Sequence, residues 1–130
     1  MMVLNLRVEG QITFLYYRNL AAAEEFYGGV MGFDKVIDLS FAKVFRISPG
    51  AHVGLVGEGG YLNPADDKPV MLTVMVEDAE AWHRMLTEKR VKTNHPPEVG
   101  KGLDMKGFLT SDPEGYILEI LQFNKKPYGY

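Results

Sequence analysis

Residues 116–123 form a short, mostly apolar run that follows a turn and contains one glutamate and one glutamine. Such a run predicts a β-strand, in which successive side chains point to opposite faces. Leu118 and Ile120 share one face, whereas Glu119 lies on the other face among apolar neighbours. A buried carboxylate is costly unless it is paired or hydrogen-bonded, so Glu119 is the first candidate for chemistry.

Helices are predicted for residues 20–30 and 79–89, where apolar positions recur at helical spacing. Asn19 and Asp78 precede these segments and are expected to cap them. Short runs rich in β-branched and aromatic residues predict the remaining strands. They span residues 11–18, 35–40, 41–48, 51–56, 70–76, 90–94 and 105–111.

The order of elements occurs twice: a strand, a helix and three further strands. A shift of 59 residues places Ile12 on Met71, in pattern more than in identity. We therefore expect a single α+β domain made of two βαβββ modules, at residues 10–57 and 69–123, joined by a linker at 58–68. Together they would form a cupped mixed sheet with the helices on its convex face, and the cup is the natural place for a ligand.

Composition narrows the function further. The chain has 130 residues, 46% hydrophobic content and no cysteine, which excludes disulfides and thiolate metal sites. A net charge of −3 argues against nucleic acid as a partner, because phosphate binding needs a basic patch. No apolar run is long enough for a membrane span, and no signal peptide is recognised. A cytoplasmic location is the default expectation.

Two stretches carry a resemblance to a known family. "YYRNLAAAEEFYGGVMGF" looks like a strand-to-helix passage, and "DPEGYILEI" is a turn followed by an alternating strand with a glutamate near its end. With the βαβββ order, these stretches resemble the vicinal oxygen chelate superfamily over residues 10–123. That group includes glyoxalase I, bleomycin-resistance proteins and extradiol dioxygenases.

The resemblance implies where a metal would sit. Metal-dependent members hold a divalent ion with histidines and glutamates, two from each module. Here the matching positions are Ile12, Gly54, Met71 and Glu119, so only one keeps a ligand. Because zinc, nickel or iron need about three or more protein ligands, no cofactor is predicted. The less favoured alternative is a divalent metal held by Glu119 and a displaced ligand, His52.

Strand parity predicts an aromatic and methionine-rich lining that suits a flat organic ligand. The expected ligand-binding residues are Phe14, Tyr16, Phe45, His52, Gly54, Met71, Thr73, Met75, Phe108 and Glu119. Gly54 should leave space for the ligand. The alternative is that these side chains pack a collapsed cup or a dimer interface.

This lining assumes tight hairpin turns without bulges. A two-residue turn at Pro49-Gly50 would place Phe45 opposite Gly54, and Ile47 would lie opposite His52. A four-residue turn at Asp112–Gly115 would place Phe108 opposite Glu119.

On that register Lys106 shares a face with Glu119 and is its first candidate partner, and the Tyr16 hydroxyl is the second. If neither side chain reaches the carboxylate, Glu119 is a candidate catalytic residue acting as a general base.

Three functions remain open. The favoured one is metal-independent binding of a small aromatic or cationic molecule by a homodimer, similar to sequestration by bleomycin-resistance proteins. The alternative is a glyoxalase-like lyase or isomerase, or a dioxygenase, that uses a displaced metal site or Glu119 as base. The third is an interaction module whose cup is filled by its own side chains or by a second chain.

Overall fold

The structure is a computed structural model that describes residues 4–100 and 104–126. The chain divides into two compact units between Pro64 and Ala65, a boundary inside the predicted linker. Residues 57–70 form no helix or strand. Each unit contains one βαβββ module, and that the two modules make up one domain stays a prediction.

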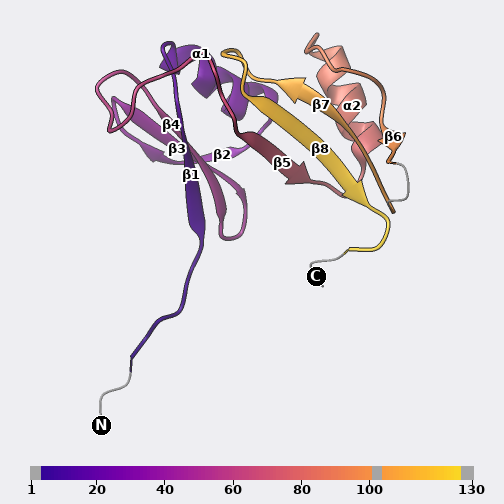
Figure 1. The fold of residues 1–130 in the computed structure, drawn as a ribbon, viewed down its shortest axis with the longest axis horizontal. Coiled ribbons are helices and arrows are strands. Elements are labelled where there is room, and N and C mark those ends of the chain that lie inside the picture. Colours follow the sequence, from indigo (N-terminus) through magenta and orange to yellow (C-terminus); the bar gives the residue numbers. More distant parts are fainter. Residues whose placement is uncertain (1–3, 101–103, 127–130) are drawn as a thin grey trace. The chain divides into compact units, whose positions relative to one another are not determined.

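The first module forms a four-stranded mixed sheet with one helical segment (Figure 1). Its elements are β1 (Gln11–Tyr16), α1 (Leu20–Glu24), the π-helix η1 (Glu25–Val30), β2 (Asp34–Asp38), β3 (Ala42–Ser48) and β4 (Ala51–Val56). The strand order is β1-β4-β3-β2. Strand β1 runs parallel to β4, and the other neighbours are antiparallel.

The helix of this module begins as predicted and ends in a wider turn. The Asn19 side chain accepts a hydrogen bond from the backbone N–H of Ala22 at 3.1 Å, which confirms it as the cap. The Met31 N–H then donates to the Phe26 carbonyl at 2.8 Å, a bond across five residues that is typical of a π-turn. The largest fully buried side chains of the module are those of Tyr17, Tyr27, Phe45, Val53 and Leu55.

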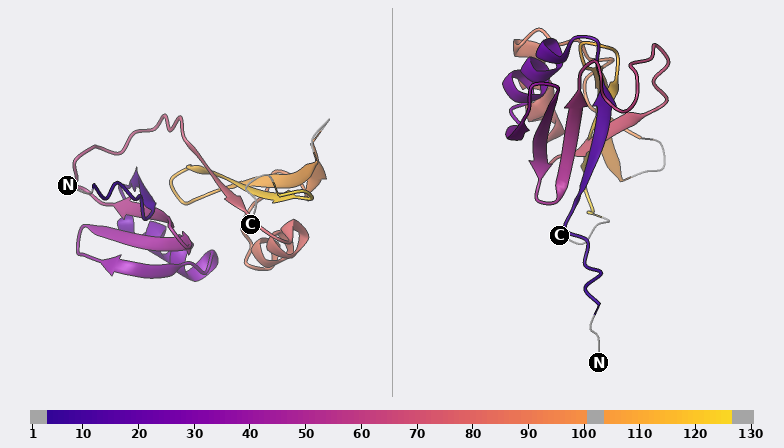
Figure 2. Two further views of the ribbon diagram at one scale, coloured as in Figure 1. Left: turned by 90° about the horizontal axis from the view of Figure 1, so that it is seen from below. Right: turned by 90° about the vertical axis from the view of Figure 1, so that its left-hand side faces the viewer.

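The second module repeats this arrangement. Its elements are β5 (Met71–Met75), α2 (Ala79–Glu88), β6 (Glu98–Val99), β7 (Met105–Ser111) and β8 (Ile117–Phe123). The order β5-β8-β7-β6, with β5 parallel to β8, matches the first sheet strand for strand and confirms the internal repeat. Helix α2 lies against one face of its sheet (Figure 2). It is capped by Asp78, whose side chain accepts from the Ala81 N–H at 3.0 Å.

The strand predicted at residues 90–94 is wrong. Only Thr93 pairs there, through an isolated bridge to Thr110. The outer strand is β6, where Glu98 and Val99 lie opposite Gly107 and Lys106. In the described part of the chain, no helix is both long and apolar enough to cross a membrane.

The register expected for the first hairpin is also wrong. Ser48 pairs with Ala51, but Arg46 pairs with His52, so Ile47 is an extra residue in a bulge. The bulge exchanges the two faces of β3, and Val44 rather than Phe45 lies opposite Gly54.

Phe45 therefore belongs to the core and not to the open face. It is 2% exposed, and its ring lies close to Gly28 of the helical segment, where a Cβ atom would be 3.0 Å from the Phe45 Cε1.

The second hairpin differs by one residue as well. Its turn includes Tyr116, because the Asp112 carboxylate accepts the N–H groups of both Glu114 and Tyr116 at 3.0 Å. Ser111 therefore pairs with Ile117.

In this register Leu109, not Phe108, lies opposite Glu119. Phe108 is 2% exposed and packs edge-on against His83 of α2 at 5.1 Å, so the prediction that it lines the open face is wrong.

Candidate functional site

The first sheet has an apolar groove on its open face, the face opposite the core. Alternation along β1 puts Leu15 in the core at 3% exposed, whereas Ile12 and Phe14 are 40% and 46% exposed. The groove has a volume of about 400 Å³. It is lined by Ile12, Phe14, Tyr16, Ile37, Leu39, Phe41, Ala42, Val44, Val56, Gly60 and Tyr61.

The chemistry of this groove is uniform. None of its lining residues carries a charge, and its only polar side-chain atoms are the hydroxyls of Tyr16 and Tyr61. Phe41, at the turn between β2 and β3, is 53% exposed. Exposed aromatic rings around an apolar hollow favour a ligand with a flat, apolar surface.

Gly54 does not leave the space that was expected of it. A Cβ atom at position 54 would lie 2.4 Å from the Phe14 Cδ1 and 3.1 Å from the Ile12 Cγ2. The ring of Phe14 therefore occupies the place where a larger residue at position 54 would project. The glycine instead lets the Phe14 side chain lie close against β4 and form part of the groove wall.

His52 lies on the same open face, opposite Ile12. Its Nδ1 donates a hydrogen bond to the Gln11 carbonyl at 3.0 Å. It lines a separate hollow together with Glu9 and Arg46, whose guanidinium is bonded to Asp34 at 3.3 Å.

The open face of the second sheet carries Glu119. The Thr73 hydroxyl donates to the Glu119 carboxylate at 3.0 Å, from the neighbouring strand β5. Met71 and Met75 follow the same alternation on β5 and are 51% and 47% exposed. This surface therefore combines flexible apolar side chains with one half-buried acid.

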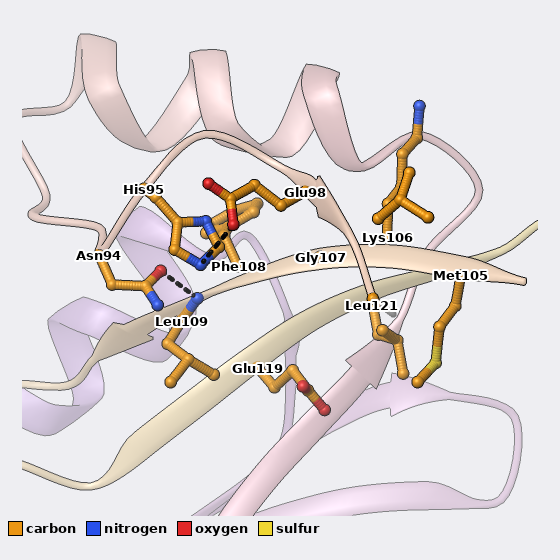
Figure 3. A pocket seen from close by; sticks show the side chains of 12 residues that line it. Asn94, His95, Glu98, Met105, Lys106, Gly107, Phe108, Leu109, Glu119 and Leu121 are labelled. Atoms are coloured by element: carbon orange, nitrogen blue, oxygen red, sulfur yellow. Dashed lines mark hydrogen bonds and ion pairs between the residues drawn. The ribbon is translucent and has the colours of Figure 1, made fainter. Parts of the chain in front are cut away.

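Lys106 is not the partner of Glu119. Its ammonium lies 2.8 Å from Glu80 of α2, on the other side of the sheet, and Figure 3 shows Lys106 and Glu119 pointing away from each other. The Lys106 ammonium holds the pKa of the Glu80 carboxyl below its ordinary value.

Glu119 borders a pocket of about 280 Å³ that reaches from β8 across β7 to the loop before β6 (Figure 3). His95 and Glu98 line it with their side chains 3.7 Å apart. The Nδ1 of His95 donates to the Pro96 carbonyl.

The residues at the expected metal positions do not fit a metal. Ile12 and Gly54 carry no donor atom, and the ring of Phe14 covers Gly54. Met71 offers only a weak thioether, which leaves one carboxylate. Within residues 4–100 and 104–126, no group of three or more histidine, cysteine, aspartate or glutamate side chains is placed to hold an ion.

The structure distributes the sequence-predicted site residues over two surfaces. The first open face holds Phe14, Tyr16, His52 and Gly54, and the second holds Met71, Thr73, Met75 and Glu119. Sequence reasoning missed part of the groove, namely Ile37, Leu39, Phe41, Val44 and Tyr61. A signal was available for the turn between β2 and β3, where "DLSF" places two large apolar residues beside polar ones.

Taken together, the fold defines the class: an α+β protein built from two βαβββ modules, each with a helix-covered face and an open face. The model of the Glyoxalase/Bleomycin resistance protein/Dioxygenase superfamily matches residues 10–120, and the chain belongs to this superfamily. No match is found among curated proteins.

Solved structures show the same fold at low sequence identity. A lactoylglutathione lyase from Agrobacterium tumefaciens is 18% identical, with a TM-score of 0.72 over 97% of this chain and 100% of that one. A glyoxalase/bleomycin resistance protein/dioxygenase from Nocardioides is also 18% identical, with a TM-score of 0.73 over 97% and 90%. A further one from Alicyclobacillus acidocaldarius is 14% identical, with a TM-score of 0.71 over 93% and 96%.

Proposed function

We propose that this protein binds a small aromatic or otherwise apolar organic molecule in the groove of the first sheet, without a metal held by the protein, and so acts by sequestration. The observation that carries the proposal is the groove itself, about 400 Å³ of apolar space with aromatic side chains at its edge. Pockets for small molecules have volumes of roughly 300–1,000 Å³ and are mostly apolar.

The lining also limits the ligand. Since no charged side chain borders the groove, a charge on the ligand gains nothing there and costs desolvation. Of the two expected kinds of ligand, aromatic or cationic, the groove therefore favours the aromatic one. A cationic ligand would need a carboxylate such as Glu119, which lies on the other sheet.

The binding test uses two probes with one ring system, 1-naphthylmethanol, which is neutral, and 1-naphthylmethylammonium, which is a cation. Isothermal titration calorimetry on the full chain should show binding of both, with the neutral compound the tighter. Failure of both compounds to bind at millimolar concentration contradicts the proposal, and so does tighter binding of the cation.

A variant pair locates the binding. Phe41→Ser removes a half-exposed ring from the groove. Full burial of such a side chain contributes about 1.5–3 kcal/mol, which is an upper bound here, so we expect a roughly tenfold loss of affinity. Ile117→Ser is the matched control, because Ile117 is 38% exposed on the other sheet and does not line the groove. An equal loss in both variants would place the site elsewhere.

Independence of metal is tested separately. Protein purified without chelators is analysed by elemental mass spectrometry, and less than a tenth of an equivalent of any transition metal is expected. A stoichiometric metal that is lost in His52→Ala would overturn this part of the proposal.

A second candidate function is proton transfer by Glu119, as in a lyase or isomerase. The specific observation in its favour is the carboxylate on an open face with a hydroxyl 3.0 Å away and, among the described residues, no ion pair. The weakness is that the Thr73 hydroxyl is already donated to Glu119, so this described neighbour of the carboxylate cannot stabilise the enolate that proton removal creates.

This candidate is tested with a lactoylglutathione lyase assay. Glu119→Gln keeps the shape and the hydrogen bond from Thr73 but removes the base, and Glu98→Gln in the same pocket is the control. Turnover that is lost only in Glu119→Gln would favour the enzyme, whereas absence of turnover in the unmodified protein would reject it.

A further inference from the structure

The chain before β1 continues the alternation of that strand. Even-numbered positions from residue 4 to residue 16 are apolar except for a glycine, and odd-numbered positions from 5 to 13 are polar. The apolar series is Leu4, Leu6, Val8, Gly10, Ile12, Phe14 and Tyr16, and the polar series is Asn5, Arg7, Glu9, Gln11 and Thr13. Residues 4–10, here called the arm, therefore have the pattern of a strand with one apolar face in phase with the open face of β1.

The arm has no pairing strand among residues 4–100 and 104–126. Leu4, Leu6 and Val8 are 69%, 82% and 82% exposed. In the described part of the chain, the backbone of the arm makes no hydrogen bond to another backbone group, and the Arg7 N–H donates only to the Asn5 side chain at 3.2 Å. Exposed strand-like segments with free backbone groups are templates for pairing with another chain.

The arm is held in line with β1. The Gln11 N–H donates to the Gly50 carbonyl at 2.9 Å, and a Cβ at Gly10 would lie 2.6 Å from that same oxygen. The chain therefore crosses the β3–β4 turn closely and then projects away from its module (Figures 1 and 2). Strand β1 is the end strand of its four-stranded sheet, so its second edge pairs with no other strand of the first module.

We propose that the arm pairs antiparallel with the arm of a second copy of this chain, in the register where the two paired residue numbers add up to 16. In this register Val8 lies opposite Val8 on the two-fold axis, Leu6 lies opposite Gly10, and Leu4 lies opposite Ile12 of the second copy. All the apolar residues then share one face that continues the open face of β1. The contact is isologous, as expected of a two-fold dimer.

Charge selects this register from its neighbours. Arg7 lies opposite Glu9 twice, once on each side of the axis, and opposite charges directly across a strand pair are favourable. A shift to a sum of 14 would place Arg7 opposite Arg7, and a shift to 18 would place Glu9 opposite Glu9. Odd sums would place polar side chains opposite apolar ones.

The first test uses the absence of native cysteine. Val8→Cys puts one thiol on each side of the axis, at a cross-strand Cα separation of about 4.5–5.5 Å that suits a disulfide. Leu4→Cys is the matched control, because its two sulfurs would be roughly 27 Å apart at ~3.4 Å per residue. Under mild oxidation we expect a covalent dimer of Val8→Cys and a monomer band for Leu4→Cys. Equal cross-linking of the two variants, or none in either, overturns the proposal.

The second test exchanges the charges. Arg7→Glu and Glu9→Arg each put like charges opposite each other at two places, so each alone should weaken dimerisation by roughly tenfold or more. An equimolar mixture of the two single variants restores both pairs and should form a heterodimer. The double variant restores them within one sequence and should form a homodimer. Sedimentation velocity with one labelled variant measures this.

All three proteins change exposed residues, and circular dichroism confirms that they fold. A wild-type chain that stays monomeric at 100 μM, or a mixture that does not restore association, contradicts the proposal. A dimer that persists unchanged in both single variants contradicts it as well.

Discussion

Gly54→Ala is the substitution that most directly tests the packing of the open face. The added methyl group would lie 2.4 Å and 2.5 Å from two carbons of the Phe14 ring, far inside van der Waals contact. The ring must therefore leave the sheet. Overpacking of a core costs about 1–3 kcal/mol, and the lower end of this range applies here because Phe14 is 46% exposed and its ring can turn towards solvent. Because Gly54 lies in β4, where its backbone φ is outside the left-handed region, the alanine itself causes no backbone strain.

A double-mutant cycle measures how much of this cost comes from the contact between positions 14 and 54. In a Phe14→Ala background the obstructing ring is absent, so Gly54→Ala should be neutral or stabilise by about 0.4–1 kcal/mol through restriction of the unfolded chain. The coupling free energy between positions 14 and 54 is then about 1–2 kcal/mol, above the ~0.5 kcal/mol seen for independent sites.

The assay is urea unfolding of the four proteins, followed by circular dichroism, with stability taken from the linear extrapolation. An equal cost of Gly54→Ala in both backgrounds would show that Phe14 does not cover position 54. It would reopen the space that the metal-binding hypothesis requires.

Three further predictions concern single groups. Lys106→Met should raise the pKa of Glu80 towards its ordinary value of 4.5, as measured by NMR. Because this pKa is lowered in the folded protein, the ion pair stabilises the fold above about pH 4.5, and this stabilisation is lost as the pH falls through the lowered value. An unchanged Glu80 titration would refute the ion pair. Asp112→Ala should lower the free energy of unfolding in urea by about 1–3 kcal/mol, because it removes the acceptor of the buried Tyr116 N–H. Asp112→Asn keeps an acceptor oxygen and should cost less, and equal costs would contradict this role. Asn19→Ala should cost about 1 kcal/mol through loss of the helix cap, and no change would show that the cap contributes nothing.

Much of the fold could be predicted because local patterns and global structure agree. The alternating strands, the caps Asn19 and Asp78 and the repeated order of elements all act over short stretches of chain. The strand predicted at 90–94 failed because Val91 and Thr93 suit a strand by propensity, while pairing with β7 decides where the strand forms.

The site was less predictable than the fold, because it depends on register. One extra residue, Ile47, moves Phe45 from the expected open face into the core. One extra turn residue, Tyr116, does the same to Phe108. The pattern of apolar and polar residues within a strand is the same with or without a bulge or a longer turn, so it predicts neither. The face on which a residue lies can therefore be predicted only as far as the next such irregularity.

The ring of Phe14 on Gly54 also restricts the order in which this surface can evolve. A protein that gains a glutamate or histidine at position 54 while the Phe14 ring remains would be destabilised. A smaller residue at position 14, if it is acquired first, frees the space for the new side chain. The two positions are thus epistatic, and a metal-binding descendant of this chain is expected to lose its phenylalanine before it acquires a new ligand.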